Sequence, residues 1–517
     1  MKQILYLLLG CLIPFQFLTA KVYSSPERTP VDYVNPYIGN ISHLLVPTYP
    51  TVHLPNSMLR IYPERENFTG NTINGLPLIV TSHRGSSAFN LSPYQGELQK
   101  AGSIIQYGYD NEVIKPYYYS VDLDDDGIYV QYAPSHQSGI YQIDFSQTDK
   151  PAYLIFNTRD GELKTDGKSI SGYQKLGNHT QVYIYLETDQ QPLKIGTHQG
   201  AVIRTTDKST QGHNAYYILE YPKGTASVLL RYGVSFISSE QAKQNLRREI
   251  KNYNLQAVAD KGRSVWNETL GKIFVKGGTE NEKTVFYTSL YRTYERMICI
   301  SEDGRYFSAY DGQVHDDEGI PFYVDDWIWD TYRATHPLRL IIETEMESNM
   351  VNSLIRMAYQ MQPNWMPTFP EINGDSRRMN CNHGVATVLD AYNKGMRSFD
   401  LAKAYQVCKA AITEKTLAPW SSKPAGVLDQ FYKDHGYFPA LAVGEQETVP
   451  EVHSWERRQP AAVTLGTVYD EWCLGNIAQA LGDKKEADYF LKRSLNYHKI
   501  FNKETCFFHP KDSFGNF

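Results

Sequence analysis

The sequence predicts a multidomain protein of mixed α and β structure, in which an N-terminal antiparallel β-sandwich precedes a helical domain. The chain has 517 residues, which is more than one hydrophobic core usually holds, so two large domains are expected. Short alternating apolar runs fill residues 31–237, whereas the β pattern fades beyond residue 273 and helical spacing replaces it. Residues 238–272 are helical in period and rich in charge, which predicts a helical linker.

The sandwich is predicted from short segments rich in Tyr, Ile and Val that alternate between apolar and polar residues. Turn-forming residues such as Asp124–Gly127 and Asp160–Gly161 separate them. The expected strands cover residues 103–109, 127–133, 139–145, 152–158, 181–188, 215–221 and 227–234.

The second half of the chain predicts helices joined by loops rich in Pro, Gly and Asp. The expected helices cover residues 280–299, 327–360, 384–396, 400–413, 471–481 and 484–501. A sandwich followed by paired helices suggests a helical toroid whose active face is formed by the connecting loops. Residues 273–517 are therefore predicted to form this helical toroid.

Composition narrows the class of function. The formal net charge is −6 and no basic block occurs, so nucleic acid is not an expected partner. The 39 Tyr and 7 Trp could stack on sugar rings, although packing within β-sheets accounts for most of the tyrosines. The cysteines after Cys11 show no paired spacing, so neither a zinc site nor a disulfide framework is expected.

The N-terminus predicts export. Lys2 precedes an apolar run from Ile4 to Leu18, and Ala20 offers a small residue at the cut, which is typical of a signal peptide over residues 1–20. The alternative is lipoprotein processing at Cys11, which follows Leu-Leu-Gly. No later run is long enough to span a membrane. A periplasmic, cell-surface or secreted location is expected.

Three segments carry polar groups typical of a ligand site. The first, Phe322–Leu338, sets Trp329, Asp330 and Arg333 at a loop-to-helix junction. Trp329 and Arg333 are expected to share a helix face, and Asp330 could accept hydrogen bonds from sugar hydroxyls while Arg333 orients it. The alternative is a capped helix with an ordinary Asp–Arg pair.

The second segment, Phe369–Gly395, gathers acids, arginines and amides in a loop ahead of a helix, and His383 counts as part of that cluster. The third segment is Glu451–Trp472, where Arg457 and Arg458 precede "VTLGTVYDEW". That stretch is predicted to be an active-site segment that leads into a helix.

These segments resemble glycoside hydrolase family 92, the exported, calcium-dependent exo-α-mannosidases. The resemblance begins at "VNPYIGN" and is strongest in "WNETLGKIFV", "WDTYRATHPL", "HGVATVLDAYNKGMRSFD" and "YDEWCLGNIAQALGDKKEADYFLKRSLNYHKIF". It implies a β-sandwich, a helical linker and an (α/α)6-type barrel. It also implies a mannose-containing glycan as partner and calcium in the pocket, with no ligand residues assigned.

The sequence departs from the family at two places. The family usually has Thr-Leu-Glu where this chain has Thr464, Leu465 and Gly466, and that Glu is the family's general acid. Asp470 and Glu471 are the nearest acids and the candidate catalytic residues, although a structural or capping role is the alternative. Glu445, Glu447 and Glu451, on the preceding loop, could also move into the site and replace the missing proton donor. Family chains continue past Phe517 and there supply the general base, so the barrel is expected to be incomplete, in a fragment or a truncated protein.

The resulting hypothesis is an inverting, exo-acting α-mannosidase-like hydrolase specialised for leaving groups that need no general acid. Its predicted substrate-binding residues are Trp329, Asp330, Arg333, His383, Arg457 and Arg458. The alternative is a non-catalytic glycan-binding relative. A phosphorylase or lyase can also join a sandwich to a helical toroid, but the family motifs argue against it.

Overall fold

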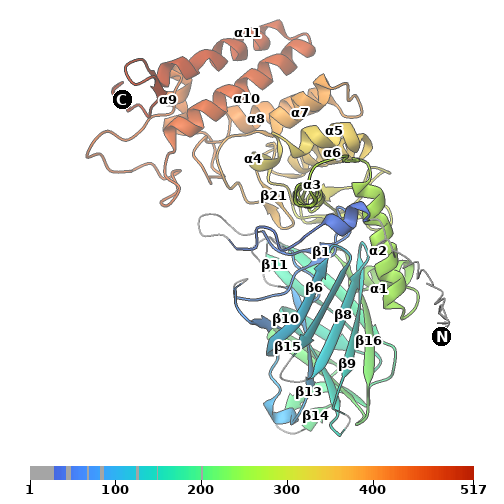
Figure 1. Ribbon diagram of the computed structural model, residues 1–517. Helices are drawn as coiled ribbons and strands as arrows, with labels where there is room; N and C mark the ends of the chain where they lie inside the picture. Colours follow the sequence, from blue (N-terminus) through green and yellow to red (C-terminus); the bar gives the residue numbers. More distant parts are fainter. Residues whose placement is uncertain are drawn as a thin grey trace, which may run out of the picture.

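The computed structural model describes residues 28–517 except 42–47, 67–68, 82–86, 124–126, 148, 178 and 200–201. An N-terminal β domain and a C-terminal helical domain lie end to end, with α1 and α2 along one side of the junction (Figure 1). This arrangement confirms the predicted fold class. The predicted signal peptide and Cys11 lie outside the described residues. No helix in the described part of the chain is long and apolar enough to cross a membrane.

The β domain is built from antiparallel strands in the order β14-β13-β15-β10-β11-β12-β16-β9-β8-β7-β6-β3, with β4 and β5 joined to this path through β10. The strands are β3 (Thr72–Asn74), β4 (Leu76–Pro77), β5 (Phe89–Gln95), β6 (Gln106–Lys115), β7 (Tyr118–Leu123), β8 (Ile128–Pro134), β9 (Ser138–Phe145), β10 (Ala152–Thr165), β11 (Ser169–Gly177), β12 (Thr180–Thr188), β13 (Lys194–Gln199), β14 (Val202–Arg204), β15 (Ser209–Tyr221) and β16 (Ser227–Ser235). A separate pair, β1 (Val52–His53) and β2 (Arg60–Ile61), lies near the junction.

Every strand segment predicted from the sequence overlaps an observed strand, although residues 103–105 of the first segment lie before β6. The predicted turn at Asp160–Gly161 is wrong, because both residues continue inside β10 and pair with β15. The other predicted turn, Asp124–Gly127, falls largely outside the described residues. The tyrosines inside this domain serve packing. Tyr232 donates a hydrogen bond from its hydroxyl to the carbonyl of Leu78 at 2.7 Å, and Tyr141 donates to the carbonyl of Pro77 at 2.5 Å. Buried hydroxyls are thus satisfied by the backbone.

The predicted linker consists of α1 (Ser239–Glu249) and α2 (Leu255–Leu270). Each begins at a side-chain cap, because Ser238 accepts a hydrogen bond from the backbone of Gln241 and Asn254 accepts one from Ala257. The indole of Trp266 on α2 is fully buried and donates to the carbonyl of His53 at 2.8 Å. The linker is therefore packed against the β domain.

The C-terminal domain is mainly helical, which agrees with an α/α barrel. Its helices are α3 (Glu280–Thr293), α4 (Ile328–Thr331), α5 (Thr335–Ile342), α6 (Thr344–Gln360), α7 (Gly384–Asn393), α8 (Leu401–Thr413), α9 (Val427–His435), α10 (Pro460–Ala480) and α11 (Lys484–Arg493). Short strand pairs lie between them: β17 (Ile298–Cys299) with β20 (Tyr323–Val324), β18 (Arg305–Ser308) with β19 (Gln313–Asp316), β21 (Pro370–Glu371) with β22 (Gly374–Asp375), and β23 (Phe501–Asn502) with β24 (Phe507–Phe508).

Three helix predictions need correction. The stretch 327–360 forms three helices, α9 was not anticipated, and α10 begins at Pro460 instead of near residue 471. "VTLGTVYDEW" therefore lies inside helix α10, and the prediction of a loop that leads into a helix at this stretch is wrong. Proline suits the first helical position, and Gln459 before it takes a left-handed conformation with φ 46° and ψ 49°. Tertiary burial along α10 outweighs the modest helix cost of Gly466.

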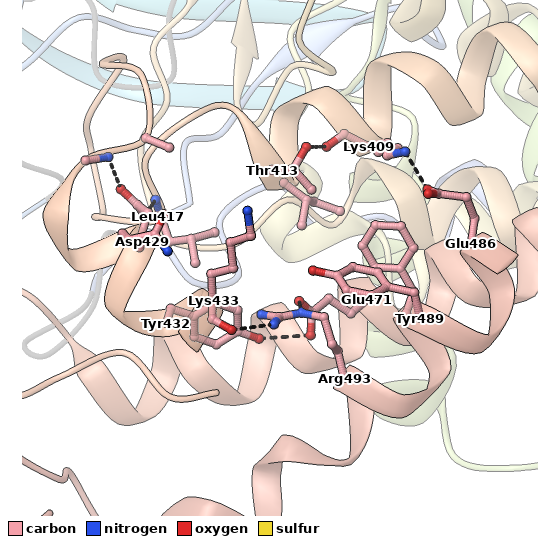
Figure 2. Close-up of a pocket in the computed structure, with 15 residues that line it drawn as sticks. Lys409, Thr413, Leu417, Asp429, Tyr432, Lys433, Glu471, Glu486, Tyr489 and Arg493 are labelled. Atoms are coloured by element: carbon pink, nitrogen blue, oxygen red, sulfur yellow. Dashed lines mark hydrogen bonds and ion pairs between the residues drawn. The ribbon is translucent and has the colours of Figure 1, made fainter. Parts of the chain in front are cut away.

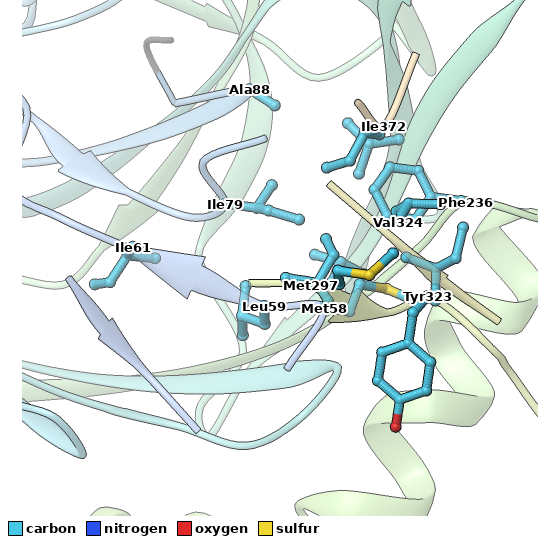
Figure 3. Packing of buried hydrophobic residues seen from close by; sticks show 14 of the residues in the cluster. Met58, Leu59, Ile61, Ile79, Ala88, Phe236, Met297, Tyr323, Val324 and Ile372 are labelled. Atoms are coloured by element: carbon cyan, nitrogen blue, oxygen red, sulfur yellow. The ribbon is translucent and has the colours of Figure 1, made fainter. Parts of the chain in front are cut away.

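A shared core fixes the helical domain on the β domain. Figure 3 shows Met58 and Leu59 packed beside Met297, Tyr323 and Val324, which come from the other side of the junction. Arg60 of β2 also donates to the Asp325 carboxylate at 2.5 Å, and each of these side chains is only 3% exposed. Removing one partner of such a buried pair typically costs about 3–5 kcal/mol, so this pair helps to hold the two domains together.

Candidate active site

A cavity of about 350 Å³ brings together residues from the three predicted polar segments. Its lining residues are Trp329, Asp330, Tyr332, Arg333, Asn380, Cys381, His383, Ala462 and Gly466. Four predicted substrate-binding residues thus share one cavity with Gly466. Its volume is in the range of small-molecule sites.

One wall of the cavity is formed by residues that come directly after Trp327 in the chain. The Trp327 ring stacks on Phe369 with 5.6 Å between ring centroids, and the guanidinium of Arg296 lies 3.8 Å from the ring centre. This packing holds the turn from which α4 begins. The next aromatic, Trp329, is 39% exposed in the cavity wall and donates from its indole nitrogen to Asn380 at 3.3 Å.

Asp330 and Arg333 both line the cavity, but they do not form the predicted pair. In the described part of the chain, neither side chain has a hydrogen-bond or ion-pair partner. α4 ends at Thr331, so Arg333 lies beyond the helix whose face it was expected to share. Burial raises the pKa of the Asp330 carboxyl above its usual value, and the charge of Asp326 raises it further against the opposing effect of Arg296. Both side chains are available to a ligand.

A buried charged triad lies behind Asp330. His336 is 1% exposed and bonds Asp326 through Nε2 at 2.8 Å and Glu347 through Nδ1 at 2.7 Å. Although burial opposes a charged ring, the two carboxylates raise the pKa of His336 to about 10. The imidazolium therefore holds Asp326 ionised beneath the cavity.

Asp470, one of the two predicted catalytic acids, is fully buried on α10 and does not line the cavity. Its carboxylate accepts a hydrogen bond from the backbone of Asn382 and another from Nδ1 of His383, each at 2.7 Å. The His383 ring also stacks on Tyr332 with centroids 4.3 Å apart. The geometry gives Asp470 the part of a residue that orients His383, whose Nδ1 carries the proton in this pairing.

Gly466 lies one helical turn after Ala462, and both face the cavity. A Cβ atom at residue 466 would lie 1.9 Å from Sγ and 3.0 Å from Cβ of Cys381, and 3.6 Å from the His383 ring. Cys381 has φ +69°, a left-handed conformation that favours glycine. The Cys381 thiol therefore occupies the space through which an acid side chain at 466 would leave the helix.

Glu471, the other predicted catalytic acid, lies on a different face of α10. Five helical residues after Gly466 correspond to a rotation of about 140°. Glu471 lines a separate cavity of about 310 Å³, and Figure 2 shows it close to Tyr432 and Arg493. Its carboxylate accepts from Arg493 Nε at 2.6 Å and from the Tyr432 hydroxyl at 3.0 Å. In this geometry Glu471 cannot reach a ligand beside Gly466.

Arg457 and Arg458 line a third cavity, of about 820 Å³, together with Glu445 and Glu447. Arg458 is buried and donates to Glu447 at 2.6 and 2.8 Å. These bonds lower the pKa of Glu447 and make it a poor proton donor. Among the described residues that line the Gly466 cavity, Asp330 is the only carboxylic acid.

The described residues do not fit a calcium site built from side-chain carboxylates. Within them, no group of three or more His, Cys, Asp and Glu side chains could hold a metal ion. Two carboxylates on the segment that leads into the cavity are engaged, since Asp325 pairs with Arg60 and Asp326 with His336. The metal ligands stay unassigned.

Sequence reasoning missed Tyr332, Asn380, Cys381 and Ala462 as lining residues. The position of Ala462 could have been predicted. A helix that begins at Pro460 places Ala462 beside Gly466, because the two residues are four positions apart. Asn380 and Cys381 belonged to the loop segment already singled out. Nothing local in the sequence shows that Cys381 meets α10.

Family models match nearly the whole described chain. The glycosyl hydrolase family 92 catalytic domain matches residues 241–517, and the N-terminal domain of that family matches residues 33–235.

Solved structures give the same picture. A family 92 inverting mannosidase from Bacteroides thetaiotaomicron is 25% identical, with a TM-score of 0.83, over 95% of this chain and 68% of that one. An α-mannosidase of the same family and organism is 22% identical with a TM-score of 0.81, over 95% of this chain and 68% of that one, and has also been solved with mannoimidazole.

Among curated proteins, a secreted glycosidase of Arthroderma benhamiae, described as uncharacterised, is 22% identical over 97% of this chain and 66% of its own length. The chain therefore spans about two thirds of the length of the relatives it matches.

Proposed function

Because the chain belongs to glycosyl hydrolase family 92, we propose that the protein is an exo-acting α-mannosidase-like hydrolase that acts on mannose-containing glycans by an inverting mechanism. We further propose that it is specialised for leaving groups that depart without a proton. The observation that supports this proposal is that Gly466, the residue expected at the position of the family's general acid, lines the cavity.

The chemistry of an absent acid decides which substrates react. An inverting glycosidase needs one acid and one base about 6.5–9.5 Å apart, so that a water fits between the base and the sugar. The acid typically contributes about 10²–10⁴-fold, because a sugar leaving group must be protonated as it departs. A phosphate or fluoride leaving group is a weak base and does not need that proton. Loss of the acid therefore penalises ordinary glycosides selectively.

The cavity supplies plausible contacts for a mannose ring. Asp330 and Arg333, which have no described partner, would bond the hydroxyls as acceptor and donor. The exposed Trp329 ring would pack against the C–H face of the sugar. His383, oriented by Asp470, would present Nε2 toward the ring. Arg457 and Arg458, also predicted to bind substrate, line the separate larger cavity and would contact a more distant part of a glycan.

A non-catalytic glycan-binding protein is the second candidate function. The observation that favours it is the position of the Cys381 thiol, because its Sγ atom would lie 1.9 Å from a Cβ at residue 466. A local structure that excludes any side chain there is incompatible with the family's acid. It remains compatible with sugar binding through Asp330 and Arg333.

Calcium, export and the domain limits extend the proposal on grounds of family and sequence. Calcium is proposed as cofactor with no ligand named, because the described carboxylates do not form a site. Export is supported by the relative described as secreted. The proposed domains are residues 31–237, 238–272 and 273–517, after a signal peptide at 1–20.

The test compares leaving groups in the natural full-length protein. α-Mannosyl fluoride, a dinitrophenyl mannoside and a mannosyl phosphodiester should be cleaved, whereas mannobiose should be cleaved more slowly by about 10²–10⁴-fold. Equal kcat/KM values for mannobiose and the activated substrates would overturn the leaving-group proposal. If none of the substrates reacts while mannose still binds, the result supports a non-catalytic glycan-binding protein.

A further inference from the structure

Trp329, whose ring is proposed above to pack against the sugar, lies on an element too short to fix that ring. α4 is a single turn from Ile328 to Thr331, and Ile328 is its only buried residue. Trp329 is 39% exposed, and among the described residues no aromatic ring or cation stacks on it. An exposed ring without packing can turn about its side-chain bonds. A single orientation toward a sugar therefore requires a restraint from outside α4.

The side chain of Asn380 provides such a restraint. The indole nitrogen of Trp329 donates to Asn380 Oδ1 at 3.3 Å, which is the one hydrogen bond of this ring within the described part of the chain. The same oxygen accepts a hydrogen bond from the Cys381 thiol at 3.0 Å. On the other side of the amide, Nδ2 donates to Oε1 of Gln459 at 2.7 Å. Two donors at the oxygen and an acceptor at the nitrogen give this amide one orientation.

The loop that carries Asn380 is itself fixed. Met379 and Cys381, on either side of Asn380, take left-handed conformations with φ of +67° and +69°. A residue other than glycine keeps such a conformation only where its surroundings hold it. The backbone nitrogen of the next residue, Asn382, donates to the Asp470 carboxylate at 2.7 Å. Asn380 therefore presents its amide from a loop that is anchored on α10.

The bond to Gln459 adds a second anchor at the start of α10. Gln459 directly precedes the first residue of that helix, and its amide nitrogen donates to the Glu456 carboxylate at 2.6 Å. Hydrogen bonds thus run in one direction from Trp329 to Glu456, and each side chain donates to the next. Reversal of either amide would place two donors or two acceptors face to face, so neighbouring bonds support one another.

We propose that Asn380 is a positioning residue for mannose binding, which acts by holding the Trp329 ring in the orientation that packs against the sugar. This inference rests on the proposed function, because it takes mannose as the ligand of the Trp329 ring. A ring that is already held in its bound orientation loses less conformational freedom when the ligand arrives, so the complex is tighter. Asn380 needs no contact of its own with the sugar for this effect.

The test titrates methyl α-mannoside calorimetrically into the natural full-length protein and its variants. Trp329→Phe keeps an aromatic ring but removes the N–H donor, and Asn380→Leu removes the acceptor. Each should raise the dissociation constant by about two- to tenfold, the range expected for ordering one side chain. The double variant should bind no more weakly than the weaker single variant, because both changes break the same hydrogen bond. Should Asn380→Leu fail to fold, Asn380→Ala takes its place with the same expectation.

Two further variants separate this role from a purely structural one. Asn380→Asp keeps an oxygen for the indole and gives up only the donor to Gln459, so its affinity for methyl α-mannoside should stay close to that of the parent. Gln459→Leu is the matched control, because it leaves the bond between Trp329 and Asn380 in place, and its affinity should also stay close to that of the parent. If Asn380 acted only through the start of α10, both variants would weaken binding as much as Asn380→Leu.

The results distinguish the positioning role from the proposed function. If the parent binds methyl α-mannoside and Asn380→Leu binds it equally well, the positioning role is wrong while the proposed function stands. Additive losses in the double variant would also overturn the positioning role, as would losses in Asn380→Asp and Gln459→Leu equal to that in Asn380→Leu. A parent that does not bind methyl α-mannoside would overturn the proposed function itself, and with it the role of Asn380.

Discussion

Helix α10 contributes residues to two cavities of similar size, and the cavities differ in how far their carboxylates are paired. On the Glu471 side, Arg493 and Tyr432 satisfy the carboxylate, and Lys409 pairs with Glu486 (Figure 2). On the Gly466 side, Asp330 and Arg333 face the cavity without partners in the described part of the chain. Satisfied charges stabilise a fold, whereas charges kept apart in a concave site await a ligand. From this difference we infer a structural role for the Glu471 carboxylate and a binding role for Asp330 and Arg333.

The strongest test of this comparison removes the partnerless carboxylate. Asp330→Ala should abolish the binding of mannose or of mannoimidazole, because the cavity loses its only described carboxylate. Stability should stay the same or rise slightly, since the charge of Asp326 disfavours ionised Asp330. Calorimetric titration and thermal unfolding measure the two effects. Asp488→Ala, an exposed acid on α11, is the matched control and should change neither.

On the opposite face the same kind of change should affect stability and spare binding. Glu471→Ala leaves Arg493 without its carboxylate in a largely buried site, which should lower the free energy of unfolding by about 3 kcal/mol. Denaturant unfolding measures it. The double variant Glu471→Leu with Arg493→Met should be less destabilised, because it leaves no unpaired charge. Lost mannose binding in a folded Glu471→Ala protein would break the comparison.

The triad beneath the cavity predicts a pH dependence of stability. The pKa of His336 is raised to about 10 in the folded protein, above the unfolded value of about 6.5. Its contribution is therefore complete below the unfolded pKa and is lost as pH rises toward 10. Between these limits the parent should lose about 1.4 kcal/mol per pH unit relative to His336→Gln. Parallel stability curves for the two proteins would contradict this.

Calcium has the smallest support in the described residues. By family membership, a chelator should weaken mannose binding by the full-length protein, and added calcium should restore it. The Asp330→Ala variant, which should not bind mannose, gives the baseline heat for this titration. Binding that is unchanged by chelation would remove calcium from the proposal.

The sequence predicted the fold more completely than it predicted the roles of individual residues in the cavity. Alternating runs such as residues 227–234 predicted strands, because a half-buried sheet imposes a period of two on its side chains. The segments around Trp329 and His383 were recognised as site segments by their polar density. The roles of Asp470 and Glu471 were not predictable, since the start of α10 depends on the left-handed Gln459. The contact between Cys381 and Gly466 is tertiary and leaves no local pattern.

The central claim is that Gly466 marks an absent proton donor whose space Cys381 now fills. Gly466→Glu alone should stay poor on mannobiose, because its Cβ meets the Cys381 thiol. Adding Cys381→Gly removes the sulfur and suits the φ of +69° at that residue. The most direct measurement is the ratio of kcat/KM for α-mannosyl fluoride to that for mannobiose in the full-length parent and in this double variant. The account predicts a ratio about 10²–10⁴-fold smaller in the double variant, through recovered mannobiose hydrolysis. A parent that already cleaves mannobiose as readily as the fluoride would contradict it, and would turn attention to Asp330 or to His383 as the donor.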